Sequence, residues 1–162
     1  MAEQQQVASI VIQQKSVFKL KDFYNFLYNL VESQGFTVFE DIYSREGENA
    51  SFEWSCKKWV DDYVQYLIWI GCSFEGIKPV KVKRGEIVEP MEKVDVKVTI
   101  KPKIITDWQA RWGTNPVTKF LKGLYDKYLF GPTLESRKKE LLEHANLIAN
   151  EIKSFFDLPR FM

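Results

Sequence analysis

The sequence predicts an α+β fold in which an antiparallel, curved sheet packs on a long C-terminal helix. In residues 63–74, YVQYLIWIGCSF, the even positions form an unbroken apolar row, and the other face still carries Leu67 and Trp69. Such a strand is typical of the centre of a sheet that is covered on both sides. Residues 94–101 alternate apolar with charged or polar side chains, and residues 134–156 carry apolar side chains at helical spacing. These patterns predict a half-exposed strand and a long helix.

The chain opens with a strand and a helix. Residues 7–14 predict a strand, because Ile10 and Ile12 share one face. Residues 20–34 predict the first helix, since apolar side chains recur every three or four positions and Gly35 follows where a C-terminal cap is expected.

Several antiparallel strands follow. Residues 36–43 and 51–60 predict two strands joined by a turn at 45–49. The aspartates at 61–62 then separate the second strand from the apolar stretch 63–74, so a close turn there pairs these two strands antiparallel. Farther on, Pro79, Pro90 and Pro102 are expected at strand ends, because proline has no N–H to donate to a ladder.

The last third of the chain is predicted to be helical. Asn115 and Pro116 form a start signal, since asparagine caps free amides and proline fits the first turn. A broad apolar stripe over 117–129 predicts a helix. The Gly131-Pro132 pair is expected to bend or break it, with a second helix resuming at Thr133.

Composition restricts the class of protein. Residues 1–162 contain no repeat or linker, so we expect a single domain. The net charge of +1 excludes the global field of a protein that wraps itself in nucleic acid. Cys56 and Cys72 are interpreted as buried thiols in a reducing compartment, with a disulfide between adjacent strands as the alternative. The sequence lacks a signal peptide pattern and a long apolar run, which predicts a cytoplasmic protein without a membrane span.

The element order resembles a known architecture. It is similar to the helix-grip fold of START and Bet v 1-like proteins, although those usually carry two short helices after the first strand and this sequence predicts one. The stretch DWQARWGTNPVTKFLKGLYDKYL, at 107–129, also looks like a segment of small uncharacterised archaeal proteins. The resemblance implies a helix-grip-like fold and transfers no functional residue.

The sequence offers little that favours catalysis. It contains no glycine-rich phosphate loop, nucleophile elbow or Cys-x-x-Cys motif, and we expect no cofactor. His144 is the only histidine, so it cannot form a metal cluster and is predicted to lie at the surface or at the boundary of the core. The aspartates at 61–62 point to opposite faces if extended, which favours a turn over an acid/base pair.

An aromatic surplus is the first functional lead. The chain has 12 Phe, 7 Tyr and 5 Trp. Some of these side chains are expected to line an apolar pocket between sheet and helix or to form a patch for a protein partner, while core filling is the alternative. The candidate residues are Trp54, Trp59, Tyr63, Trp69, Trp108 and Trp112.

A basic and aromatic stretch at 78–112 is the second lead. If its strands pair, its lysines are predicted to share one exposed face, where they would contact phosphates of a single-stranded RNA while a tryptophan stacks on a base. The alternative is a solvated face whose lysines discourage aggregation, and nearby glutamates dilute the charge. The candidate residues are Lys81, Lys83, Arg84, Lys97, Lys101 and Arg111.

Two hypotheses follow. The first is a non-enzymatic binding protein that holds a hydrophobic small molecule or a protein partner. The second is an RNA- or ribonucleoprotein-associated factor. Salt discriminates between them, because phosphate contacts weaken steeply as salt rises and apolar burial does not.

Overall fold

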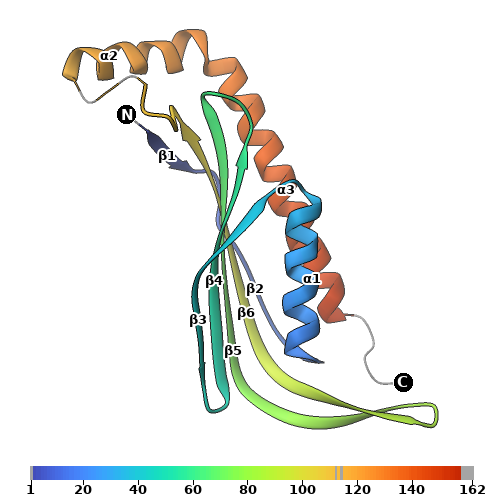
Figure 1. The fold of residues 1–162 in the computed structure, drawn as a ribbon. Helices are drawn as coiled ribbons and strands as arrows, with labels where there is room; N and C mark the ends of the chain where they lie inside the picture. The colour runs from blue at the N-terminus through green and yellow to red at the C-terminus, as the bar shows by residue number, and fades with distance from the viewer. Residues whose placement is uncertain (1, 112, 114, 158–162) are drawn as a thin grey trace.

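A computed structural model describes residues 2–111, 113 and 115–157, except for the side chain of Arg84. It shows an α+β protein in which a curved antiparallel sheet packs against the C-terminal helix in a helix-grip-like arrangement (Figure 1), which confirms the predicted fold class. The strands are β1 (Glu3–Gln6), β2 (Ile10–Phe18), β3 (Thr37–Glu46), β4 (Asn49–Trp59), β5 (Val64–Arg84) and β6 (Ile87–Thr106). The helices are α1 (Leu20–Ser33), α2 (Pro116–Leu124) and α3 (Gly131–Asp157), with a π-helical turn, η1 (Tyr125–Leu129), between the last two.

The sheet has the order β1-β6-β5-β4-β3, and β2 also pairs with β6. Strands β1 and β2 follow one another along the same edge of β6, with a break at residues 7–9. The strand predicted at 7–14 is observed as β2, which begins at Ile10 and continues to Phe18, and β1 before it was not predicted. Pro102 lies inside β6 opposite this interruption, where its carbonyl accepts a hydrogen bond from the Val7 amide at 2.8 Å. The missing N–H of proline therefore coincides with the break between β1 and β2 along this edge.

Strand β5 lies inside the sheet, but the prediction that both of its faces are covered was wrong. Helices α1 and α3 lie on the same face (Figure 1), and the described residues place no helix on the other. There the Trp69 indole lies across Gly71, so that a Cβ atom built at Gly71 would be 2.4 Å from the ring. The Lys101 ammonium lies over this ring, 5.2 Å from its centroid. The second apolar face of β5 is thus explained by Trp69, whose ring lies flat on the open side of the sheet.

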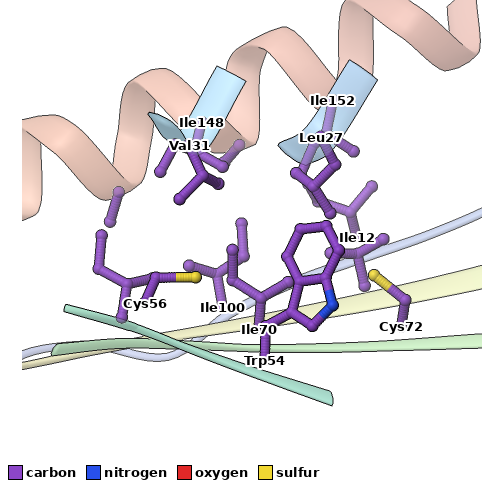
Figure 2. Close-up of a cluster of buried hydrophobic side chains, with 14 of the residues drawn as sticks. Ile12, Leu27, Val31, Trp54, Cys56, Ile70, Cys72, Ile100, Ile148 and Ile152 are labelled. Carbon is purple, nitrogen blue, oxygen red and sulfur yellow. The ribbon is translucent and has the colours of Figure 1, made fainter. Parts of the chain in front are cut away.

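The hydrophobic core fills the space between the helices and the sheet. Figure 2 shows Leu27 and Val31 of α1, with Ile152 of α3, facing Trp54 and Ile70 of the sheet. All five side chains are fully buried. None of the described helices is long and apolar enough to cross a bilayer.

Strands β5 and β6 continue beyond the sheet as a two-stranded arm (Figure 1). Pro79 and Pro90 lie within this arm, although the sequence predicted them at strand ends. A two-stranded ribbon has two free edges, so a proline that points its nitrogen outward removes no ladder bond. The tip exposes Ile87 and Val88, at 64% and 55% of their surface.

Candidate functional site

The space between sheet and helices is packed at its centre and open at one end. Beside the start of α1 lies a pocket of about 350 Å³, which we call the α1-end pocket. Its apolar wall is formed by Leu20, Tyr24, Phe52 and Phe74. Phe52 and Phe74 are almost completely buried in the sheet, and the Tyr24 ring meets Phe52 edge-on with 5.2 Å between centroids. The wall is therefore built from side chains that packing already holds in place.

A bulge in β3 brings further side chains to the pocket. The register between β3 and β4 shifts between Glu40 and Ile42, so that Tyr43 pairs with Phe52. Tyr43 thereby shares the helix-facing side of the sheet and lines the pocket, while Ile42 is half exposed on the other side. An extra residue in one strand reverses the facing of all residues after it.

The rim of the pocket carries two cations and one carboxylate. Lys21 and Arg45 are exposed there. The Glu92 carboxylate accepts a hydrogen bond from the Leu20 amide at 3.4 Å. This carboxylate therefore also stabilises the first turn of α1. The Tyr24 hydroxyl donates to Glu40 at 2.8 Å, and burial, reinforced by this carboxylate, raises the pKa of Tyr24 to about 12. Tyr24 therefore stays protonated at neutral pH, and the rim carries the cations Lys21 and Arg45 beside the single carboxylate of Glu92.

The predicted aromatic residues do not form one surface. Trp54 is buried in the core and touches the pocket wall through Phe52, with 4.8 Å between centroids. Trp69 lies on the open face of the sheet, and Trp59 is 45% exposed at the end of β4. Trp112 lies outside the described residues.

Tyr63 and Trp108 lie at the opposite end of the sheet. The Trp108 indole N–H donates to the Asp61 carbonyl at 2.8 Å, and Arg111 donates its backbone N–H to the Asp107 carboxylate at 2.8 Å. Tyr63, Asp107 and Arg111 line a second hollow of about 500 Å³ with Asp62 and Tyr125.

The predicted basic residues also separate. Lys97 and Lys101 lie on the open face, opposite Ser73 and Trp69 of β5. An extra residue in β5 between Glu75 and Lys78 shifts the pairing of the two strands. As a result Lys81 and Lys83 pair with Pro90 and Val88, which are even-numbered positions of β6. Lys97 and Lys101 are odd-numbered positions of the same strand. Because side chains alternate along a strand, Lys81 and Lys83 lie on the opposite side of the ribbon from Lys97 and Lys101. The prediction that these lysines share one face was therefore wrong, and the Arg84 side chain lies outside the described part of the chain.

A buried polar cluster, which sequence reasoning missed, holds α2 against the ends of β1 and β6. The Lys122 side chain is completely buried, and its ammonium lies 2.6 Å from Asp126, 3.0 Å from the Thr106 hydroxyl and 3.3 Å from Glu3. The Tyr63 hydroxyl donates to Asp126. Burial and Asp126 together raise the pKa of Tyr63 above its ordinary range. We call these five residues the Lys122 cluster.

The Lys122 cluster sets the orientation of α2. The sequence predicted an apolar stripe at 117–129, and the structure turns this stripe toward solvent. The stripe's exposed members are Val117, Phe120, Leu121, Leu124, Tyr128 and Leu129. The signal that indicates this orientation is the i,i+4 pair of Lys122 and Asp126 on the side opposite the stripe.

The remaining reactive groups are occupied or buried. The His144 Nδ1 lies 2.9 Å from the Gln34 side-chain oxygen, and its ring meets Phe36 edge-on. Burial, followed by the charge of Lys58, lowers the pKa of His144. Cys56 and Cys72 are buried free thiols, and burial raises the pKa of both. Neither thiol is available as a nucleophile in this arrangement.

No protein-family model, curated protein or solved structure matches this chain.

Proposed function

We propose that this chain is a non-enzymatic binding protein that holds a small hydrophobic molecule with an anionic end in the α1-end pocket. The observation that carries the proposal is the pocket itself, about 350 Å³ between α1 and the sheet. Small-molecule sites have volumes of roughly 300–1,000 Å³ and combine apolar walls with a few polar groups.

The walls and the rim support different parts of the ligand. The rings of Tyr24, Phe52 and Phe74 offer an apolar surface that is formed before any ligand enters. Ligand binding there requires little ordering of side chains, which favours affinity. At the rim, the exposed Lys21 and Arg45 offer two cations to an anion, against the single carboxylate of Glu92.

The RNA hypothesis receives less support from the geometry. Trp69, the aromatic side chain nearest to Lys101 across the strands, already lies beneath its ammonium. The lysines of the arm and of the open face do not share a surface, so a nucleic acid strand would not meet them together.

The test is a titration with the fluorescent apolar anion 1-anilinonaphthalene-8-sulfonate. We expect saturable binding that Ala50→Leu reduces at least roughly tenfold, because Ala50 lines the pocket and a larger side chain fills it. Thr99→Leu is the matched control, since it adds an apolar side chain on the open face and is expected to leave binding unchanged.

A second substitution tests the charge at the rim. Arg45→Gln should weaken the anionic dye and leave a neutral apolar dye unaffected. Equal dye binding by the native chain and by Ala50→Leu would overturn the proposal.

A further inference from the structure

The stripe on α2–η1 is the largest run of exposed apolar side chains along one described helical segment. Phe120 is 65% exposed, Tyr128 67% and Leu129 75%, and Val117, Leu121 and Leu124 lie between 39% and 64%. Their spacing places them along one side of the segment. Contiguous apolar patches of this kind mark interaction sites on soluble domains.

The stripe is exposed because the opposite side of the helix is specifically bound. The Lys122 ammonium has three oxygen partners within 3.3 Å: Asp126, Thr106 and Glu3. The Lys122 ammonium also lies over the Tyr63 ring, 5.6 Å from its centroid. Burying a charge is costly unless its partners are well placed, so a helix that only had to cover the end of the sheet would turn its leucines inward. The chain instead supplies a complete set of partners for a lysine and leaves the apolar side chains in water.

The exposed charges of α2–η1 itself have one sign. Lys119 and Lys127 are both exposed on this segment. The only carboxylate of α2–η1 is Asp126, which binds Lys122 and Tyr63. The complementary surface is therefore apolar and edged with negative charge.

The shape of the surface favours one occupant. α2 lies at one end of the molecule (Figure 1), where the Lys122 cluster joins it to the ends of β1 and β6 and the side chains of the stripe are exposed. A projecting apolar ridge with lysines on the polar side of the same segment fits a flat, deformable surface. Amphipathic helices of this composition bind in the plane of an anionic bilayer, with apolar side chains at the boundary of headgroups and acyl chains.

We propose that α2–η1 docks this protein on the surface of an anionic lipid bilayer. Phe120, Leu124 and Leu129 enter the headgroup region, and Lys119 and Lys127 contact lipid phosphates. The Lys122 cluster holds the segment in the orientation that this contact needs. The inference is independent of the α1-end pocket.

The test is co-sedimentation of the full chain with vesicles of phosphatidylcholine containing phosphatidylglycerol, and with vesicles of phosphatidylcholine alone. We expect binding to the anionic vesicles and weak binding to the neutral ones. The double variant Phe120→Gln/Leu129→Gln should weaken binding by roughly tenfold or more, since two large apolar side chains no longer enter the bilayer.

Matched controls separate this surface from others. Ile87→Gln/Val88→Gln removes two comparably exposed apolar side chains from the β5–β6 arm and should leave vesicle binding unchanged. Ala50→Leu should also leave it unchanged, which distinguishes this test from that of the pocket. Lys119→Gln and Lys127→Gln should each lower binding about fivefold, as expected for one lysine at an anionic surface.

Three results would overturn the proposal. They are failure of the native chain to bind anionic vesicles, equal binding to neutral vesicles, and full binding by the Phe120→Gln/Leu129→Gln variant. A fourth such result comes from sedimentation equilibrium without lipid. If the native chain self-associates and the Phe120→Gln/Leu129→Gln variant does not, the stripe binds a second copy of the chain. Far-UV circular dichroism confirms that each variant is folded.

Discussion

Helices α2 and α3 follow one another with only η1 and Phe130 between them, and both are amphipathic, yet they orient their apolar sides in opposite directions. In α3 the buried side chains include Leu141, Ala145, Ile148 and Ile152. In α2 the buried side chain is Lys122. An apolar stripe thus establishes that a helix has an apolar face, but the partners of the opposite face decide where that face points.

The surroundings of the two helices explain the difference. α3 runs along the sheet, where Val96, Val98 and Ile100 of β6 present apolar side chains. α2 lies at the strand ends, where Glu3 and Thr106 supply oxygen atoms to Lys122. An amphipathic helix therefore buries its apolar side where it lies over the sheet and exposes it where it lies at the strand ends.

The largest expected effect compares one leucine from each helix. Leu141→Ala in α3 should lower the free energy of unfolding by about 2–5 kcal/mol, because the side chain is completely buried and its removal leaves a cavity. Leu129→Ala in η1 should change it by less than about 0.5 kcal/mol, because three quarters of that side chain is already in water. Chemical denaturation measures both free energies of unfolding. Equal losses would show that Leu129 is packed as tightly as Leu141.

A smaller effect is expected at the Lys122 cluster. Lys122→Met removes the cation and leaves the Asp126 carboxylate, which is only 17% exposed, without its ion pair. We expect a loss of about 3 kcal/mol, and the double variant Lys122→Met/Asp126→Leu should recover most of it. Denaturation of the single and double variants measures the recovery, and a harmless single variant would show that the cluster does not hold α2.

The smallest effect is the pH dependence contributed by His144 of α3. Burial, followed by Lys58, lowers the pKa of His144 below its ordinary value of 6.5, although Glu140 and Glu143 oppose the shift. As pH falls through that ordinary value, the unfolded chain takes up a proton that the folded chain resists, so stability decreases. His144→Gln should therefore lose less stability than the native chain between neutral and mildly acidic pH. Thermal unfolding measures this, and identical losses would contradict the assigned burial.

Sequence periodicity predicted most of the elements. The helix predicted at 20–34 is observed as Leu20–Ser33, with Gly35 at a positive φ of 88° after it. The strands predicted at 36–43 and 51–60 are observed as β3 and β4 with shifted ends. The length of β5 was missed, because Pro79 and Pro90 are compatible with a two-stranded arm and only the tertiary arrangement shows that the arm exists.

The candidate pocket was less accessible to sequence reasoning. Strict alternation along residues 36–43 puts Ile42 on the same face as Phe36 and Val38, but the bulge before Ile42 turns it outward and brings Tyr43 to the pocket. A bulge of one residue leaves little trace in an alternating pattern, and it reverses every assignment after it. The orientation of α2 was beyond sequence reasoning for a related reason, since periodicity identifies the faces of a helix without identifying what covers them.

The most direct test of the outward orientation of α2–η1 is the reactivity of an introduced thiol in the native, lipid-free protein. Cys56 and Cys72 are buried with raised pKa values, so the native chain should react slowly with a disulfide reagent such as 5,5′-dithiobis(2-nitrobenzoate). We expect Leu129→Cys to react as fast as a thiol in the unfolded chain, and Leu141→Cys to remain as protected as the native thiols. Protection of Leu129→Cys equal to that of Leu141→Cys would show that the stripe is buried and would contradict the account.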